Sequence, residues 1–422
     1  MFGVTLLFDK SFLQSLSAEE SLWLDMFYIS NICPYFYVET LADLNKGDDR
    51  EKAEQEVRKI AKKFPEINGL PNVSHVNLCV GELFGSKIPM QGQIVCPPAR
   101  NFNNNGEVGF YADSSPEADA FLRWQHGQYY EIEHNQAQLW RQTLDSLDLD
   151  SIATSFKTFK IDERKCKNLD DCFTLADEIL SSTNFRIEKM NLALNFLQLP
   201  DNAKKMVVSR WKANGYQKLS KYAPYMAYVL KLELFFQIAI FNKQISSIRK
   251  SNRTDISYLF YLPFTEIFVT NDDQQLKWAK HFLNPKQEII DGKALKEDLK
   301  ALNLFYKENI TEKEAEKGII SLVQHPPFEG DFLTSKLWDK YRPNWRKTDS
   351  NKVFKSMPEK LEKIPESKKA FLKEIKKDSI INPQLDFDPS QHVFVRQKFV
   401  RQTKGTWYQV DKNIPPIEDE TA

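Results

Sequence analysis

The sequence lacks the features that mark several common classes of protein. Its five cysteines have no paired CxxC spacing, and they lie at Cys33, Cys79, Cys96, Cys166 and Cys172. The opening residues MFGVTLLFDKSF have neither the basic start nor the small-residue cleavage site of a signal peptide. A GxSxG elbow and a glycine-rich phosphate loop are also missing, which excludes serine hydrolase and P-loop chemistry. We expect a protein of a reducing cytoplasm.

An excess of charge is missing as well. Lys and Arg together number 58, and Asp and Glu together number 58, so any contact with nucleic acid has to be local. The most apolar stretch, Ala223 to Asn242, is nearly long enough to span a bilayer. Lys231 and Glu233 at its centre would each cost roughly 2.5 kcal/mol or more in lipid. We therefore expect a buried helix of a soluble protein and no membrane partner.

What the chain does contain is an alternation of apolar helices and short strands. Residues Gly3 to Phe8 predict a strand that feeds a helix, and YFYVETLADL predicts a second helix opened by Pro34. Much later, EIFVT predicts a strand, QQLKWAKHFL a helix and QEIID a closing strand. This alternation predicts an α/β protein with a parallel central sheet flanked by helices.

The chain divides into three parts by composition. We expect a discontinuous core at 1–44 and 221–300, a mainly helical insertion at 45–220, and a C-terminal extension at 301–422. In the extension, Thr334 to Asp378 holds fourteen Lys or Arg against seven Asp or Glu. This basic segment could bind a phosphate backbone while Trp338, Tyr341 or Trp345 stacks on bases, or it could be a solvated linker whose apolar residues pack on the core. His392 to Val410 predicts a hairpin around Thr403-Lys404-Gly405.

Four acidic residues stand at positions that suit a divalent cation. Asp9 ends the first strand, Asp272 follows the strand EIFVT, Asp255 begins the helix ISYLFYLPF, and Glu39 lies in a helix that is apolar on most sides. The carboxyl ends of parallel strands converge on one crevice, where oxygen ligands can hold Mg²⁺ or Mn²⁺. Each residue also has a plain structural reading. An Asp before a helix is a favoured N-cap, and Glu39 could form a salt bridge.

The arrangement of these pieces resembles the PIN-domain nucleases, a family that includes the VapC-type toxins. LLFDKSFLQSL resembles their first acidic strand and YFYVETLADL their second acidic helix. RTDISYLFYLPFTEIFVTNDDQQLKWA is similar to their later Asp-helix-strand-TxD segment, and QEIIDGKALKEDL to their closing strand. The order Asp, Glu, Asp, Asp is the order of the family. The long segment from Asn45 to Arg253 departs from the compact family pattern.

The resemblance implies a Rossmann-like PIN domain and a metal-dependent endonuclease. Its catalytic residues and metal ligands would be Asp9, Glu39, Asp255 and Asp272, with Asp273 or Asn271 as weaker candidates. Mg²⁺ or Mn²⁺ would be the cofactor, and RNA a more favoured substrate than DNA. A protein partner could bind through the insertion.

Two other functions remain open from the sequence. One is a non-catalytic scaffold that keeps the PIN fold as an interaction module, which the large insertion favours. The other is a nuclease for single-stranded DNA. A separate metal site built on Glu131 and His134 would be half of a di-iron motif, and the second copy that such sites need is missing.

Overall fold

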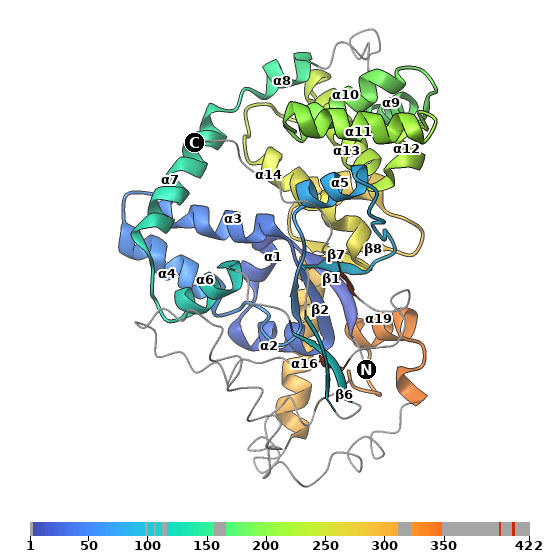
Figure 1. Ribbon diagram of the computed structural model, residues 1–422. Helices are drawn as coiled ribbons and strands as arrows, with labels where there is room; N and C mark the ends of the chain where they lie inside the picture. Colours follow the sequence, from blue (N-terminus) through green and yellow to red (C-terminus); the bar gives the residue numbers. More distant parts are fainter. Residues whose placement is uncertain are drawn as a thin grey trace.

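The computed structural model describes residues 3–97, 100–104, 107–111, 116–155, 166–310, 323, 325–347, 396–397 and 407–409. At its centre is one parallel sheet of five strands, flanked by helices (Figure 1). The strand order is β3-β2-β1-β7-β8, with the bounds Val4–Phe8 for β1, Tyr28–Ile32 for β2, Gly69–Pro71 for β3, Ile267–Thr270 for β7 and Glu288–Asp291 for β8. The predicted α/β class with a parallel central sheet is confirmed.

The direction of the connections reverses between β1 and β7. From β1 the chain adds β2 and then β3 on one side, whereas β7 and β8 are added on the other side of β1. In the register of the two central strands, Phe8 lies opposite Val269. The residues that follow these two strands therefore emerge side by side at the carboxyl edge of the sheet, where α/β proteins usually bind their ligands.

Short helices connect the strands, and their ends follow local sequence rules. Helix α2 begins with a capping box, in which Ser17 accepts from the Glu20 amide and Glu20 accepts from the Ser17 amide. Helix α3 has Pro34 at its first position, where a missing amide proton costs nothing. The helices between β1 and β4 have these bounds: α1 Lys10–Ser15, α2 Ala18–Phe27, α3 Pro34–Ala42, α4 Arg50–Ala61 and α5 His75–Leu83.

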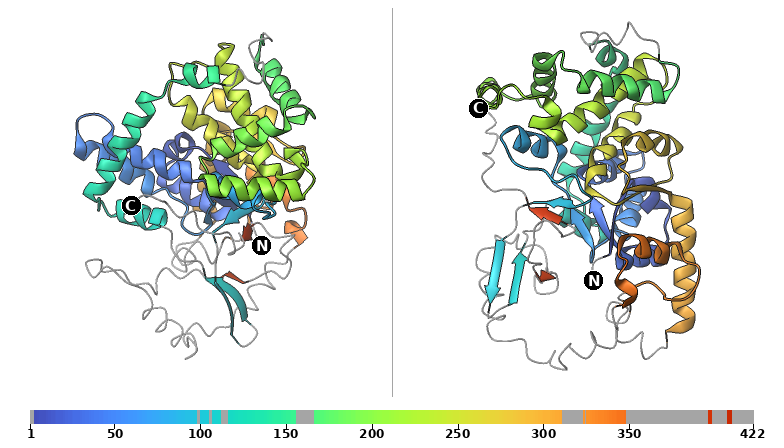
Figure 2. Two further views of the ribbon diagram at one scale, coloured as in Figure 1. Left: turned by 45° about the horizontal axis from the view of Figure 1, so that its top comes forward. Right: turned by 90° about the vertical axis from the view of Figure 1, so that its right-hand side faces the viewer.

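The range 45–220 is mostly helical, as predicted, and its later helices stack on the long helix α13 (Figures 1 and 2). In the right-hand view of Figure 2 these green helices lie at the top, far from the N-terminus. After α5, the helices up to α12 have the bounds α6 Pro116–Gln125, α7 Glu131–Ser146, α8 Leu149–Ser155, α9 Leu169–Ser181, α10 Arg186–Phe196, α11 Asp201–Ala213 and α12 Leu219–Tyr222. Helix α13, which belongs to the predicted core, spans Pro224–Phe241.

The sheet uses more of the chain than the predicted core of 1–44 and 221–300. Strand β3 lies inside the range assigned to the insertion, yet it pairs with β2. The Ser30 amide also donates to the Asn68 carbonyl over 2.8 Å. Helix α16 (Gly292–Asn309) crosses the predicted boundary at residue 300, and α19 (Leu333–Tyr341) contacts β1. Part of the insertion and part of the extension therefore complete the sheet layer.

Helix α13 is the apolar segment that the sequence marks as nearly long enough for a membrane. By length and composition this is the one described helix that could cross a bilayer, and 78% of it is buried inside the protein. The Lys231 ammonium pairs with Asp177 over 2.5 Å, and Glu233 pairs with Arg253 over 2.6 Å. The helix is therefore buried in the core of the protein, as the buried-helix prediction expected.

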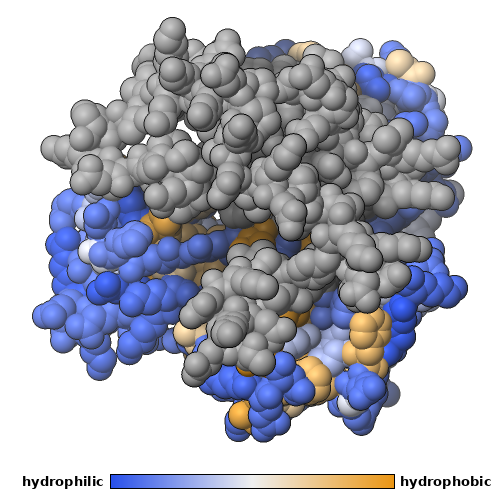
Figure 3. Space-filling model, turned by 90° about the horizontal axis from the view of Figure 1, so that it is seen from below, coloured by the Kyte–Doolittle hydropathy of each residue, from blue (hydrophilic) through white to orange (hydrophobic). Residues whose placement is uncertain are grey.

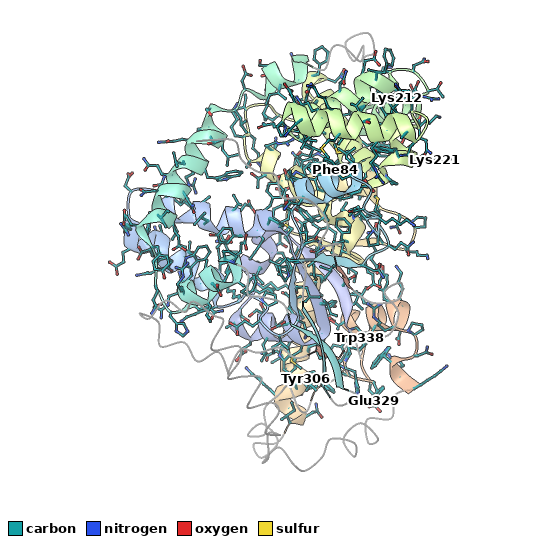
Figure 4. The ribbon with its side chains drawn as sticks, in the orientation of Figure 1. Phe84, Lys212, Lys221, Tyr306, Glu329 and Trp338 are labelled. Atoms are coloured by element: carbon teal, nitrogen blue, oxygen red, sulfur yellow. The ribbon has the colours of Figure 1, made fainter. Side chains whose placement is uncertain are left out.

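The structure bears on two expectations for the extension. Trp338 and Trp345 are 1% and 0% exposed, and the Trp338 indole donates to the Phe27 carbonyl over 3.0 Å. Figure 4 labels Trp338, beside the ribbon of α19. Neither ring is available to stack on a base, because each fills the core beneath α19. This favours the packing alternative for 334–347, whereas 348–378 lies outside the described residues.

Seen from below, the described surface is mainly hydrophilic (Figure 3).

The second correction concerns the hairpin expected in His392 to Val410. Strand β9 (Arg396–Gln397) pairs with β6 (Glu107–Tyr111), and β10 (Trp407–Gln409) pairs with β4 (Ile94–Cys96). β6 also pairs with β5 (Arg100–Asn104). The two strands therefore pair with different partners from the earlier part of the chain, and not with each other. Local alternation predicted the strands but not their partners.

Candidate active site

Asp9 lies at the carboxyl end of β1 and caps helix α1. Its Oδ1 accepts from the Phe12 amide over 3.1 Å, and its Oδ2 accepts from the Ser11 hydroxyl over 2.5 Å. The residue is 5% exposed. Burial raises the pKa of Asp9 to about 6, and the nearby negative charge of Glu39 adds to the increase against the hydrogen bonds that lower it. Asp9 is therefore both an N-cap and a partner in a cluster of like charges.

Asp272 occupies the matching position after the neighbouring strand β7. Its Oδ1 accepts from the amides of Gln274 and Gln275 over 2.7 and 3.0 Å, which caps helix α15 (Asp273–Ala279). Its own amide donates to the Thr270 hydroxyl over 2.9 Å, and Thr270 also bonds to the Asp9 side chain. The two strand-end acids thus share Thr270 as a neighbour.

Glu39 reaches the same region from helix α3. Its Oε2 accepts from the Tyr258 hydroxyl over 2.5 Å, and its backbone carbonyl accepts from the Lys10 ammonium over 3.3 Å. Desolvation raises the pKa of Glu39, against the charge of Lys10 and the bond from Tyr258. Among the described residues Glu39 forms no salt bridge, and the nearby Lys10 pairs with Asp43 over 2.9 Å.

Asp255 completes the set from helix α14 (Asn252–Ser257), which continues as a 3-10 helix over Tyr258–Phe264. Burial, together with the negative charges of Glu39, Asp272 and Asp9, raises the pKa of Asp255 to about 8. Asp255 is therefore close enough to the other three acids to feel their charge. The four carboxylates lie in one region, although up to hundreds of residues separate them in the chain. Such repulsion is relieved by a proton or a cation.

The two weaker candidates behave differently from these four. Asp273 is exposed as the first residue of α15. The Asn271 amide nitrogen donates to the Ser11 carbonyl over 3.4 Å, and its Oδ1 is buried without a hydrogen-bond partner. Asn271 therefore lies beside the Asp9 segment, whereas Asp273 makes no contact with the other acids among the described residues.

Sequence reasoning missed a cation at the centre of this cluster. The Nη2 atom of Arg249 lies 3.0 Å from Asp272 Oδ2 and 3.4 Å from Asp255 Oδ2. The positive charge of Arg249 lowers the pKa of Asp255 against the larger upward effect of burial. Arg249 comes from the loop between α13 and α14, and its only signal in the sequence is a basic run, RKSNR, directly before Thr254 and Asp255.

A second balanced group lies beside Glu39. Asp43 begins the 3-10 helix Asp43–Asn45, and its two oxygens pair with Lys10 over 2.9 Å and with Arg141 over 3.6 Å. Arg141 also donates to the Ala42 carbonyl over 2.8 Å. Helix α7, which carries Arg141, is thereby tied to α3, which carries Glu39. This contact connects the range 45–220 with the acidic site.

The donor set fits a hard cation by chemistry, since all four side chains offer carboxylate oxygens. Its geometry is not that of a finished metal site. Among the described residues, no group of three or more His, Cys, Asp or Glu is arranged to hold a metal ion. The Oδ2 atoms of Asp255 and Asp272 are both engaged by Arg249. A metal that used these oxygens would therefore have to take the place of the Arg249 guanidinium.

An open pocket of about 690 Å³ borders this region along helix α15. Gln274 and Lys277 of α15 line the pocket, together with Lys280 and His281 of the 3-10 helix Lys280–Phe282 that follows it. Its other wall comes from the start of α9 and from Gln244 in the loop that carries Arg249. The pocket is lined by none of the four acids, and its link to them in the chain is Gln274, two residues after Asp272.

The histidines do not form a second metal site in the described residues. His134 Nε2 lies 3.0 Å from Glu54, and Glu131 pairs with Arg50 over 2.9 Å. The half-motif of Glu131 and His134 is therefore divided between two surface ion pairs.

Comparison with known proteins gives no relative: no family model matches the chain, and no curated protein or solved structure matches it.

Proposed function

We propose that this protein is a metal-dependent endonuclease with a Rossmann-like PIN domain, most favourably one that cuts RNA. The observation that carries the proposal is the position of two buried or half-buried acids, Asp9 and Asp272, at the ends of adjacent strands that flank the reversal point of the sheet. Counted within the sheet, the strand order is 3-2-1-4-5, which matches the order of doubly wound nucleotide-binding sheets. Ligands of such sheets bind at this point.

Each of the four acids has a distinct position in the proposed site. Asp9 and Asp272 would hold the cation from the two strand ends, whereas Glu39 and Asp255 would hold it from helices on either side. Bound there, Mg²⁺ or Mn²⁺ would supply a lowered pKa for the attacking water and would neutralise charge on the phosphodiester oxygens. Ser11, Thr270 and Tyr258 would orient the carboxylates, because each of them donates to or contacts one of these acids.

The pocket along α15 supports a path for the substrate strand. Lys277 and Lys280 are exposed there, and a single strand bound beside Asp272 would bring its phosphates close to both ammonium groups. Acidic and basic residues are equal in number over the whole chain, so binding of a phosphate backbone depends on local positive charge of this kind. Base identity and the 2′-hydroxyl would be read elsewhere in the protein.

A non-catalytic scaffold is the second candidate, and specific observations favour it. Asp9 and Asp272 both cap helices, Arg249 pairs with two of the acids, and no described group of acids is arranged for a metal. In this reading the carboxylates are structural, and the large helical part of the chain serves as the binding surface. This candidate predicts no dependence on a divalent ion.

The experiment that separates the two is a cleavage assay on mixed labelled RNA and single-stranded DNA with Mg²⁺, Mn²⁺ or a chelator. Asp9→Asn and Asp272→Asn should each reduce the rate by about 10²-fold or more, the order seen when one electrostatic group is removed from an active site. Asp291→Asn is the matched control, because Asp291 also ends a strand of this sheet and caps the next helix. Cutting that persists in both site variants would contradict the proposal.

A further inference from the structure

The guanidinium of Arg249 is the positive group that stands between two of the proposed metal ligands. Its side chain is 49% exposed, whereas those of Asp255 and Asp272 are 14% and 20% exposed. The arginine therefore reaches inward from the solvent side. Its Nε donates to the Ser251 hydroxyl over 2.9 Å, which fixes the plane of the guanidinium while Nη2 faces the two acids.

The oxygens that Arg249 occupies are those that a metal would need. Asp272 Oδ1 already accepts from two amides at the start of α15, so Oδ2 is the oxygen left for a cation. That Oδ2 is 3.0 Å from Arg249. A divalent ion binds carboxylate oxygens at about 2.0 to 2.6 Å, and it also repels a guanidinium at the same oxygens. The two cations therefore compete for one position.

The cost of leaving these acids without a positive partner explains why such a residue is present. Asp255 lies within the field of three other carboxylates, and a cluster of like charges is unfavourable unless a counter-ion is near it. An arginine suits this task, since its charge is permanent and its several N–H groups can contact two carboxylates at once.

We propose that Arg249 is the resident counter-ion of the acidic site in the metal-free protein, and that a divalent metal has to displace its guanidinium in order to bind. The proposal rests on the metal site of the proposed function. It implies that the loop between α13 and α14 sets the metal affinity of the site, because this loop carries the competing charge.

The test is Mn²⁺ binding to the full chain, measured by calorimetry without substrate. Arg249→Gln should bind Mn²⁺ about tenfold more tightly than wild type, a change that corresponds to loss of two partly exposed ion pairs. Without metal, its melting temperature should be lower than that of wild type, and saturating Mn²⁺ should remove the difference. Arg249→Lys keeps the charge but loses the Nε bond to Ser251 that fixes the guanidinium, and should fall between the two proteins in Mn²⁺ affinity.

Arg50→Gln is the matched control. Arg50 is 54% exposed and also bridges two acids, Glu54 and Glu131, over 3.1 and 2.9 Å, at a site away from the four carboxylates. This variant should leave Mn²⁺ affinity unchanged. A general effect of removing surface charge would appear in both arginine variants.

The possible failures are distinguishable. If wild type and Arg249→Gln bind Mn²⁺ equally, and Asp272→Asn loses that binding, the metal site stands and the role of Arg249 is overturned. If no variant binds Mn²⁺, the metal site of the proposed function fails, and the counter-ion role fails with it. Should Arg249→Gln not fold, Arg249→Lys provides the same comparison of affinities.

Discussion

Single acidic residues in this protein combine two roles that the sequence presents as alternatives. Asp9 and Asp272 each cap a helix through one oxygen, as their positions before helical segments predict. Each also lies near other carboxylates, which capping alone does not require. The acid positions could be predicted, because strand-end acids converge in a parallel sheet. Arg249 could not, because no local pattern shows that a loop arginine turns toward residues that are distant in the chain.

The raised pKa values predict how the stability of the metal-free protein depends on pH. The pKa of Asp255 is about 8 and that of Asp9 about 6, both above the value of 3.8 for an unperturbed Asp. The folded state therefore holds protons that the unfolded state has lost. This contribution to the free energy of unfolding is full below about pH 4 and is lost as the pH rises toward 8.

Asp255→Asn removes the larger of these contributions. In the presence of a chelator, the free energy of unfolding of this variant relative to wild type should increase steadily between about pH 4 and pH 8, because only the wild-type side chain can ionise. Urea denaturation at several pH values measures the difference. Asp291→Asn, a change at an exposed strand end, should show no such trend. A pH-independent difference for Asp255→Asn would contradict the proposed crowding of negative charge.

Elements with strong local patterns were predicted, and elements fixed by their partners were not. Apolar runs predict the strands β1, β7 and β8 and the helices α3 and α13. Pro34 and Pro224 stand at the first positions of the two helices. β2 was not located, because it continues from α2 without a turn residue between Phe27 and Tyr28. β3 has three residues, and only its pairing with β2 defines it.

A further prediction concerns Lys277 of α15 and Lys280 of the 3-10 helix that follows it, which both line the pocket. If a substrate strand passes the pocket, Lys277→Gln with Lys280→Gln should weaken binding of single-stranded RNA. It should also reduce the slope of log affinity against log salt by roughly 0.7 for each phosphate contact that is lost. Fluorescence anisotropy with the cleavage-deficient Asp9→Asn background measures this without cutting.

The control pair for this prediction is Lys300→Gln with Lys307→Gln. Both lysines lie on α16, and their side chains are 59% and 55% exposed. This pair should leave the salt slope unchanged if the path runs along α15. Equal slopes for the two double variants would place the substrate elsewhere on the protein.

At the scale of the whole molecule, the parts of the chain are more interdependent than composition suggests. Composition shifts mark where the segment after Asn45 begins, but they do not show that β3 returns to the sheet or that Arg141 contacts Asp43 beside the site. For the aromatic residues of the extension, the sequence left stacking on bases and packing on the core open as alternatives. Trp338 and Trp345 pack in the core. Burying a large aromatic ring is strongly favourable, and the basic residues around it in the sequence do not change that.

The most direct test of the proposed metal site is an anomalous difference map from a crystal of the wild-type protein grown with Mn²⁺. We expect one peak between the ends of β1 and β7, with oxygens of at least three of the four acids Asp9, Glu39, Asp255 and Asp272 within about 2.0 to 2.6 Å of it, and with the Arg249 guanidinium moved away. A map without a peak there, with Arg249 still paired to Asp255 and Asp272, would contradict the account and return these carboxylates to helix capping and ion pairing.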